Sequence, residues 1–370
     1  MPNQFQICYF PYLFLNNEKM VDYGNIFIWN FGLLCSDKIK DDNLRKHITK
    51  LIASNVMNRK PISGIGIISF KNGNDFEPLN KKEVRELDEL RRVLFLSSVA
   101  KSNIHDGPNM GHFMVTADNF NIIYQYFLLG SEHTAYQAGK IVSVKSGGHR
   151  IGEVIYEKPR YVLTTNFSID KKLFSTLKQL KKKNNRIFRR IVRATEAMMN
   201  GYSNSDDISC ESSILEQARA FEILLELPER NQREDFKLKI EKYCSLNFER
   251  KRRYKSLRTK GKCVHEVGTR QKMWADRFYC FRNHIIHGER IRESDFYFYG
   301  QRHQDLALWF YLVCLKRILN EAFGNEIFSD IIRCESGKFE YDKQPLKPII
   351  AEFTRRSVYF KQAFSLYLNL

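Results

Sequence analysis

The chain lacks the cysteine spacings that mark a zinc ribbon or a dense disulfide framework. Its eight cysteines are scattered, and no two of them are separated by only two residues. Zinc ribbons and small disulfide-rich domains both need closely paired cysteines. Free thiols in a reducing compartment are the simplest account of this pattern, so the cysteines favour a cytoplasmic protein.

Long hydrophobic runs are also missing. The apolar run LALWFYLVCL at 306–315 has only about half the residues that a membrane-spanning helix needs. The N-terminal segment MPNQFQICYFPYLFL has no basic residue ahead of its apolar stretch, which makes it a poor signal peptide and a better β-strand. We therefore expect a soluble protein that has no membrane partner.

Acidic residues are too few to balance the basic ones. The 370 residues include 60 Lys and Arg against 42 Asp and Glu, which gives a formal net charge of +18. This excess fits a partner that carries phosphates, nucleic acid first and an anionic membrane surface second, although a merely basic soluble protein has the same balance. With 43% hydrophobic residues, the chain can bury a core for one large domain or two.

The N-terminal part of the chain mixes strand-like and helix-like segments. Gly147 and Gly148 favour a hairpin within VKSGGHRIG. Two stretches have a helical pattern: DDNLRKHITKLIASNVM, which begins at Asp41, and NKKEVRELDELRRVLFLSSVAK, for which Asn80 is a suitable N-cap. We find no Gly-rich phosphate loop and no triad pattern, and we expect residues 1–167 to form an α+β or α/β domain. The expected strands are QICYFPYLFL, NIFIWNF, GIGIISF, HFMVTA, NIIYQYFLL and IGEVIYEKPRYVLTT.

After about residue 168 the strand patterns give way to helical periodicity. One apolar stripe consists of Ile214, Ala218, Phe221 and Leu225, at positions i, i+4, i+7 and i+11, and Pro228 ends it. We predict that residues 168–370 form an all-helical bundle. The other expected helical segments are SIDKKLFSTLKQLKKKNNRIFRRIVRATEAMMNGY, QREDFKLKIEKYCSLNF, QDLALWFYLVCLKRILNEAF and AEFTRRSVYFKQAFSLYL.

Two runs of basic residues lie in this helical half. KQLKKKNNRIFRRIVR at 178–193 and RKRRYKSLRTKGK at 250–262 each hold eight Lys or Arg and no acid. Like charges at helical spacing repel one another, so a chain that keeps two such runs gains from a polyanion, while a solvated face or a mobile loop is the plainer alternative. The candidate RNA-binding residues are Lys181, Lys182, Lys183, Arg186, Arg189, Arg190, Arg250, Lys251, Arg252 and Arg253.

The stretch CFRNHIIHGE at 280–289 gathers an arginine, an asparagine and two histidines. We predict a helix from about Arg270 to His287, in which one face lies against the core and the other is polar. Asn283 and His287 are i, i+4 neighbours that can touch, and Gly288 is placed to end the helix. The core stripe consists of Trp274, Phe278, Phe281 and Ile285, and the polar face carries Tyr279, Arg282, Asn283 and His287.

Histidine, arginine and asparagine together fit cleavage of RNA by its own 2′-hydroxyl group. Near neutral pH, His287 can remove the 2′-OH proton or protonate the leaving 5′-oxygen. Arg282 can stabilise the charge on the pentacovalent phosphate, and the Asn283 amide can hold the imidazole or a phosphate oxygen. No divalent ion is required, and we find no carboxylates spaced for two metals. These residues predict a metal-independent endoribonuclease that uses no cofactor.

The segment YCFRNHIIHG resembles the R-x4-6-H signature of the HEPN superfamily, with Arg282 and His287 as its arginine and histidine. The form RN…HG looks like the Apea-like branch, which is related to abortive infection. LEQARAFEILLEL resembles the family's earlier helix, which often carries a glutamate, here Glu222. The resemblance covers roughly residues 185–325. In the toxin branch controlled by a nucleotidyltransferase a tyrosine follows the histidine by two places; here Glu289 stands there, so that mode of control is not expected.

The resemblance implies a helical bundle that pairs through two-fold symmetry into a homodimer. Arg282 and His287 from both copies would then face one composite cleft. Members are commonly metal-independent endoribonucleases, often in antiviral or toxin systems, and an added N-terminal domain would be a sensor or regulator with an unknown trigger. The supporting site residues on this interpretation are Glu222, His284 and Tyr279.

Other interpretations of the same residues stay open. Cys280, His284 and His287 share a helix face and could be three zinc ligands, although core packing is the usual explanation of a lone cysteine. His284 is either structural or substrate-facing, and Glu222 either orients the arginine or is an ordinary helix carboxylate. We expect Tyr279 to pack at a dimer seam. The helical half could also be a non-catalytic module that binds RNA or mediates assembly.

Overall fold

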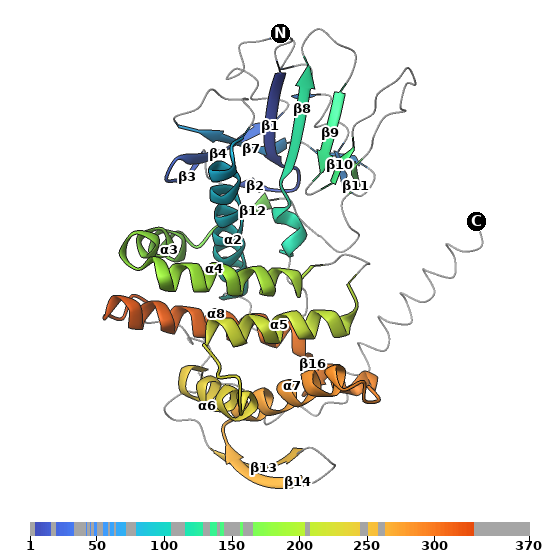
Figure 1. The fold of residues 1–370 in the computed structure, drawn as a ribbon, viewed down its shortest axis with the longest axis vertical. Coiled ribbons are helices and arrows are strands. Elements are labelled where there is room, and N and C mark those ends of the chain that lie inside the picture. Colours follow the sequence, from blue (N-terminus) through green and yellow to red (C-terminus); the bar gives the residue numbers. More distant parts are fainter. Residues whose placement is uncertain are drawn as a thin grey trace, which may run out of the picture. The chain divides into compact units, whose positions relative to one another are not determined.

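The computed structural model describes the chain from residue 4 to residue 328, with gaps (Figure 1). Continuous description covers 79–104, 115–128, 166–203, 208–244, 251–257 and 263–328, and shorter segments are described between 4 and 71 and between 134 and 157. Residues 1–331 form one compact unit, and residues 332–370 form a second unit, which lies outside the described residues. The predicted helix AEFTRRSVYFKQAFSLYL falls in that second unit.

Among the described residues, seven N-terminal strands form an antiparallel sheet in the order β10-β9-β8-β1-β7-β4-β3. β1 is central because it pairs with β8 on one side and with β7 on the other. Tyr9, Phe31 and Ile67 are among the side chains buried in its core. The strands are β1 (Gln4–Phe10), β3 (Met20–Tyr23), β4 (Ile26–Gly32), β7 (Gly64–Phe70), β8 (Ile123–Leu128), β9 (Thr134–Ala138) and β10 (Ile141–Ser143).

Smaller pairings complete the described strands of this half. β5 (Asn55–Met57) pairs with β6 (Lys60–Pro61) and with β11 (Tyr156–Glu157). β2 (Phe14–Leu15) pairs with β12 (Asn166–Phe167). The α+β class predicted for this half fits the structure, because the strands of the main sheet are all antiparallel.

The structure confirms four expected strands, since QICYFPYLFL, NIFIWNF, GIGIISF and NIIYQYFLL contain β1 with β2, β4, β7 and β8. The prediction for HFMVTA was wrong in its described part, where Val115 and Thr116 lead into a 3₁₀ turn at Ala117–Phe120. The helix expected from Asp41 was wrong at its end, because Asn55–Met57 pairs as β5. The hairpin VKSGGHRIG and most of IGEVIYEKPRYVLTT lie outside the described residues.

Helix α2 (Lys81–Ile104) joins the sheet region to the helical part of the chain. Asn80 is its N-cap, as predicted: Oδ1 accepts the N–H of Glu83 at 3.1 Å, and the Glu83 carboxylate accepts the Asn80 N–H at 2.8 Å. Further along α2, the Ser97 carbonyl accepts the N–H of Asp170 at 2.9 Å, and Arg92 forms an ion pair with Glu196. These bonds tie α2 to residues after the last strand of the N-terminal half.

The helical part forms around a cluster of aromatic side chains. Phe221 contacts the rings of Phe236, Trp274, Phe278 and Tyr311, with centroids 5.1 to 6.2 Å apart. Such edge-to-face pairs stabilise a core beyond the area that they bury. The helices are α3 (Lys171–Lys183), α4 (Asn185–Asn200), α5 (Cys210–Leu224), α6 (Gln232–Cys244), α7 (Arg270–Ile286) and α8 (His303–Phe323). None of the described helices is long and apolar enough to cross a membrane.

The prediction that everything after residue 167 is helical was wrong in two places. β13 (Arg252–Leu257) pairs with β14 (Cys263–Gly268), and β15 (Tyr297–Phe298) pairs with β16 (Gln301–Arg302). In β13, buried Tyr254 and Ser256 alternate with exposed basic residues, a period of two that suits a strand. The predicted division into domains 1–167 and 168–370 stays a prediction, since residues 1–167 and 168–331 belong to the same compact unit.

Candidate functional site

Helix α7 carries the predicted site and begins at a capping residue. The Thr269 hydroxyl accepts the backbone N–H of Lys272, with 3.3 Å between the oxygen and the nitrogen. Trp274, Phe278 and Phe281 are buried, as expected for side chains that share one face of a helix. The predicted helix of the sequence analysis is therefore confirmed, with its start at the expected residue.

The helix ends where glycine was expected to end it. His287 is the C-cap, and Gly288 follows with φ of +64°, in the left-handed region that glycine adopts without strain. The N–H of His287 donates to the Asn283 carbonyl at 3.0 Å. Ile285 is only half-buried, against expectation, and Ile286 is exposed. The last turn of α7 therefore lies at the surface.

Arg282 is held by three neighbours in this last part of the helix. Its Nη2 lies 3.0 Å from Glu222 Oε1 on α5, and its Nη1 lies 3.0 Å from Asn283 Oδ1. The guanidinium stands over the Tyr279 ring, 5.2 Å from the centroid. The Arg282 and Glu222 side chains are 22% and 20% exposed. The guanidinium is thus fixed in position, and the Arg282 side chain remains partly exposed.

Tyr279 supports this arrangement from inside the bundle. Its hydroxyl donates to Glu222 Oε1 at 2.8 Å and lies 2.7 Å from Gln232 Oε1 at the start of α6. Burial, followed by the nearby Glu222 charge, raises the pKa of the phenol, so it stays protonated and serves as a donor. The expectation that Tyr279 packs at a dimer seam does not fit, because the side chain is buried within a single copy.

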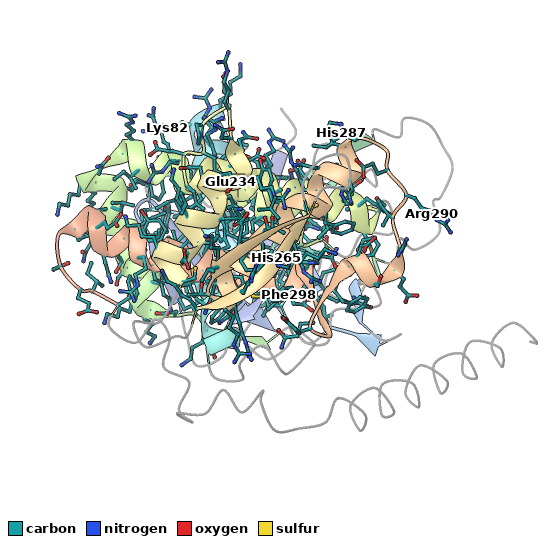
Figure 2. The ribbon with its side chains drawn as sticks, turned by 90° about the horizontal axis from the view of Figure 1, so that it is seen from below. Lys82, Glu234, His265, His287, Arg290 and Phe298 are labelled. Carbon is teal, nitrogen blue, oxygen red and sulfur yellow. The ribbon has the colours of Figure 1, made fainter. Side chains whose placement is uncertain are left out.

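His287 is exposed at the end of α7, on the segment that leads to Arg290 (Figure 2). Five residues separate it from Arg282, which places the two side chains about 140° apart around the helix axis. Among the described residues no hydrogen bond joins the Asn283 and His287 side chains, and the Asn283 amide oxygen accepts from Arg282. One copy of α7 therefore presents the guanidinium and the imidazole in different directions.

His284 interacts with two side chains rather than with Arg282. Its Nε2 lies 3.3 Å from Cys280 Sγ and 3.5 Å from Glu289 Oε2. Burial raises the pKa of the Cys280 thiol, which keeps it protonated. The zinc alternative receives no support from the residues that the structure describes, where no three His, Cys, Asp or Glu side chains are grouped to hold an ion.

The first basic run is partly neutralised by the protein itself. Lys181 on α3 forms an ion pair with Glu89 on α2, and Arg190 on α4 forms one with Glu226. These two candidates are therefore poorly placed for RNA, because each already has an acidic partner. The exposed candidates of this run are Lys182, Lys183, Arg186 and Arg189.

Part of the second basic run forms a strand, although an all-helical bundle was expected after residue 167. Lys251 precedes β13, and Arg252 and Arg253 are its first two residues; all three are exposed. Arg250 lies outside the described residues. Because successive residues of a strand face opposite sides, Arg252 and Arg253 point in opposite directions and cannot contact the same phosphate group from one face.

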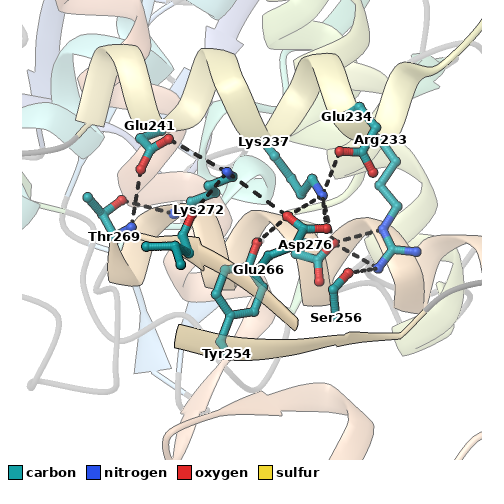
Figure 3. Close-up of polar contacts among 11 residues, drawn as sticks. Arg233, Glu234, Lys237, Glu241, Tyr254, Ser256, Glu266, Thr269, Lys272 and Asp276 are labelled. Carbon is teal, nitrogen blue, oxygen red and sulfur yellow. Dashed lines mark hydrogen bonds and ion pairs between the residues drawn. The ribbon is translucent and has the colours of Figure 1, made fainter. Parts of the chain in front are cut away.

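Sequence reasoning missed a cluster of ionic side chains between α6, α7 and the β13–β14 hairpin (Figure 3). Lys237 is fully buried, and its Nζ lies 2.9 Å from each carboxylate oxygen of Glu266 and 2.7 Å from Glu234 Oε2. Asp276 on α7 is 1% exposed and accepts from Arg233 Nε at 2.9 Å. The cluster fastens the hairpin to both helices.

Hydrogen bonds from the hairpin complete this cluster. The Tyr254 hydroxyl donates to Glu266 Oε2 at 3.0 Å, and Ser256 Oγ accepts from Arg233 Nη2 at 3.2 Å. Burial alone would raise the pKa of the Glu266 carboxyl, but the hydrogen bonds from Lys237 and Tyr254 outweigh it and hold the pKa below its usual value. The available sequence signal was Lys237, which lies beside the apolar stripe of α6. A lysine that is buried at such a position needs an acidic partner.

No protein-family model, curated protein or solved structure matches this chain. The resemblance to the HEPN superfamily therefore depends on the motif at 280–289 and on the helix that carries Glu222.

Proposed function

We propose that this chain is a metal-independent endoribonuclease of the HEPN type, with Arg282, Asn283 and His287 as its reacting group of side chains. The observation that carries the proposal is the contact between Glu222 and Arg282, which come from helices 60 residues apart in the sequence. It orients a partly exposed guanidinium beside an asparagine, on the helix whose C-cap is the exposed His287.

The directions of the side chains support a homodimer. A guanidinium and an imidazole that point about 140° apart cannot both reach one phosphate from the same helix. A second copy, related by a two-fold axis, brings a second Arg282 and a second His287 to the same cleft, as the resemblance implies. The composite site then contains the two imidazoles that acid–base cleavage needs.

The proposed reaction follows from these positions. One His287 imidazole removes the proton of the ribose 2′-OH, and the 2′-oxygen attacks the adjacent phosphorus. The bond from phosphorus to the 5′-oxygen breaks, a 2′,3′-cyclic phosphate remains, and the second imidazolium gives its proton to the 5′-oxygen. Arg282 stabilises the negative charge on the pentacovalent phosphate, and Asn283 holds the guanidinium in place. A role in antiviral defence, with residues 1–167 as a sensor, comes from the resemblance.

Purified His287→Ala and Arg282→Ala test this proposal. Each is expected to cleave labelled RNA at least about 10²-fold more slowly than wild type in the presence of EDTA, because each removes proton transfer or charge stabilisation in the transition state. Arg282→Lys is expected to fail as well, since an ammonium lacks the planar fork. The exposed Lys82 on α2 provides the control, and Lys82→Ala should cleave as wild type does.

Folding and size are measured alongside cleavage, by circular dichroism and by sedimentation. Unchanged cleavage in folded, dimeric His287→Ala and Arg282→Ala would show that the site is elsewhere. A wild-type protein that binds RNA tightly and never cuts it would establish the alternative, a non-catalytic module for RNA binding or assembly.

A further inference from the structure

The β13–β14 hairpin, here called the ribbon (Arg252–Leu257 and Cys263–Gly268), has two different faces. The inner face carries Tyr254, Ser256 and Glu266, which join the ionic cluster. The register places Lys255 opposite His265 and Arg253 opposite Val267, and all four side chains are exposed. Because residues directly opposite one another share a face, these four lie on the outer face of the ribbon, where the register also places the pair Leu257 and Cys263.

The outer face is basic and has no acidic member. Arg253 and Lys255 form no ion pair with any residue that the structure describes, unlike Lys181 and Arg190 of the first basic run. Two cations at alternate positions of one strand lie about 7 Å apart and repel each other. The connecting segment 258–262, RTKGK, adds three more basic residues to the sequence of the ribbon. A surface of this kind gains from a polyanion.

The inner face of the ribbon is bonded to helices α6 and α7 (Figure 3). Glu266 accepts from buried Lys237 at 2.9 Å and from Tyr254 at 3.0 Å, and Arg233 links Ser256 to Asp276 on α7. A face that is fixed before it meets its ligand loses little conformational entropy on binding. The inner contacts therefore prepare the outer face for a ligand.

The ribbon is also continuous with the helix of the proposed site. β14 ends at Gly268 and α7 begins at Arg270, so a single residue separates them. Along α7, Asp276 beneath the ribbon lies 11 residues before His287, which corresponds to about 16 Å of helix. At about 3.4 Å of rise per nucleotide, a strand of roughly five nucleotides covers that distance.

We infer that the outer face of the ribbon binds the sugar–phosphate backbone of RNA and holds the strand that enters the site on α7. The inference deepens the proposed function. RNA binding by the ribbon does not depend on that function, whereas delivery of the bound strand to the site on α7 does. An anionic membrane fits less well, because binding at a lipid surface needs buried apolar area, and Val267 is the one apolar side chain among the four exposed side chains described for the outer face.

Binding is measured first, with His287→Ala as the background so that no RNA is cut. Arg253→Ala/Lys255→Ala in that background is compared with Lys81→Ala/Lys82→Ala, which removes the same charge from exposed positions on α2 (Lys82 is labelled in Figure 2). With an RNA of about 20 nucleotides, the ribbon variant should bind about tenfold more weakly, and the slope of log K against log salt should become shallower by about 1.4. The α2 variant should keep both values.

Cleavage is measured second, with His287 intact. At sub-saturating concentration, the ribbon variant should cut an RNA of about 20 nucleotides roughly tenfold more slowly than wild type. It should cut an RNA of about three nucleotides at the wild-type rate, because so short a strand does not reach from the ribbon to His287. Arg253→Lys/Lys255→Arg keeps the charge and should bind the longer RNA as wild type does. Contacts to phosphate groups depend on the positive charge more than on the shape of the side chain.

The outcomes separate the two proposals. Equal RNA binding by the ribbon variant and the α2 variant overturns the ribbon inference, whatever the protein cleaves. Weaker binding in the ribbon variant, together with a wild type that never cleaves, supports the ribbon and removes the nuclease. Loss of binding to phosphatidylserine vesicles with unchanged RNA binding would assign the face to a membrane and overturn the inference. Loss of cleavage on short and long RNA alike would also contradict the ribbon inference. The substitutions would then affect cleavage by disturbing the fold rather than by weakening the binding of the strand.

Discussion

The first half of helix α7 and its last turn both pair acids with bases, but they differ in exposure. At the first half, Asp276 and its neighbour Lys237 from α6 are almost completely shielded from solvent. At the last turn, Arg282 and Glu222 keep about a fifth of their side-chain surface exposed. The same residue types therefore face different dielectric surroundings along a single helix.

The difference shows which charges maintain the fold and which are available for chemistry. A buried ion costs several kcal/mol to desolvate and is tolerated only when partners surround it, so removing one partner is strongly destabilising. A partly exposed pair keeps some of its hydration, contributes about 1 kcal/mol or less, and can exchange one partner for a ligand. We expect mutations in the first half of α7 to change stability, and mutations in its last turn to change activity.

Lys237→Met should give the largest effect. The substitution leaves Glu266 and Glu234 without their buried cation, and the free energy of unfolding should fall by about 3 kcal/mol, measured by urea denaturation. Adding Glu266→Gln to Lys237→Met should recover part of the loss, because the uncompensated charge is then gone. Lys242→Ala removes a lysine from an exposed ion pair with Glu321 and is the control, with an expected change below about 1 kcal/mol.

Equal losses in Lys237→Met and Lys242→Ala would show that burial does not distinguish the two ion pairs. The contrast between the two ends of α7 would then have no energetic basis.

His303 sharpens the comparison because it is a buried base with no acidic partner among the residues that the structure describes. It packs against Phe278, Phe281 and Trp274, and burial, followed by the charge of Arg277, lowers its pKa to about 3. Below about pH 6.5 the His303 imidazole binds a proton in the unfolded chain but not in the folded chain. The free energy of unfolding therefore falls as the pH falls. Between pH 7 and pH 5, wild type should lose about 2 kcal/mol more than His303→Gln.

Urea denaturation at both pH values measures this difference. Asp305, whose pKa burial raises to about 6, contributes with the opposite sign between about pH 4 and pH 6, since its folded form holds a proton that the unfolded chain has released. That contribution is present in both proteins and cancels in the comparison. Parallel pH profiles for wild type and His303→Gln would mean that the folded protein accepts the proton on His303.

Glu222→Gln should have the smallest effect on stability and a clear effect on cleavage. Loss of the carboxylate frees the Arg282 guanidinium to move, and the cleavage rate should fall about tenfold, or about 1.4 kcal/mol in transition-state free energy. In an Arg282→Ala background the same substitution should change nothing more, because Glu222 acts only through the arginine. Additive losses in the double variant would contradict this positioning role. Glu216→Gln, on the same helix and paired with Arg219, is the matched control.

The parts of the fold that follow from local pattern could be predicted from the sequence. Asn80 as an N-cap, the stripe through Trp274 and Phe278, and Gly288 as the end of α7 each depend on residues within a few positions of one another. The position of Glu222 was suggested only by the motif resemblance, since its contact with Arg282 joins residues 60 positions apart.

The ribbon could not be predicted in the same way, because its strand pattern is carried by polar residues. Tyr254 and Ser256 face inward since Glu266 and Arg233 are there to meet them, and those partners come from β14 and α6. A helix and a solvated loop suit the same basic run equally well when such non-local partners are ignored. The segment Asn55–Met57 was misjudged for a related reason, as one of its two strand partners is β11, about 100 residues away.

The joint between β14 and α7 has a consequence for cooperativity. Thr269 donates its N–H to Glu241 on α6 while its hydroxyl caps α7, and a Cβ added at Gly268 would lie 2.5 Å from the Lys272 side chain. β14 cannot detach without disturbing the first turn of α7. We therefore expect the two strands and the opening turns of α7 to unfold as one cooperative unit, with the backbone amides of the hairpin exchanging as slowly as those of the helix.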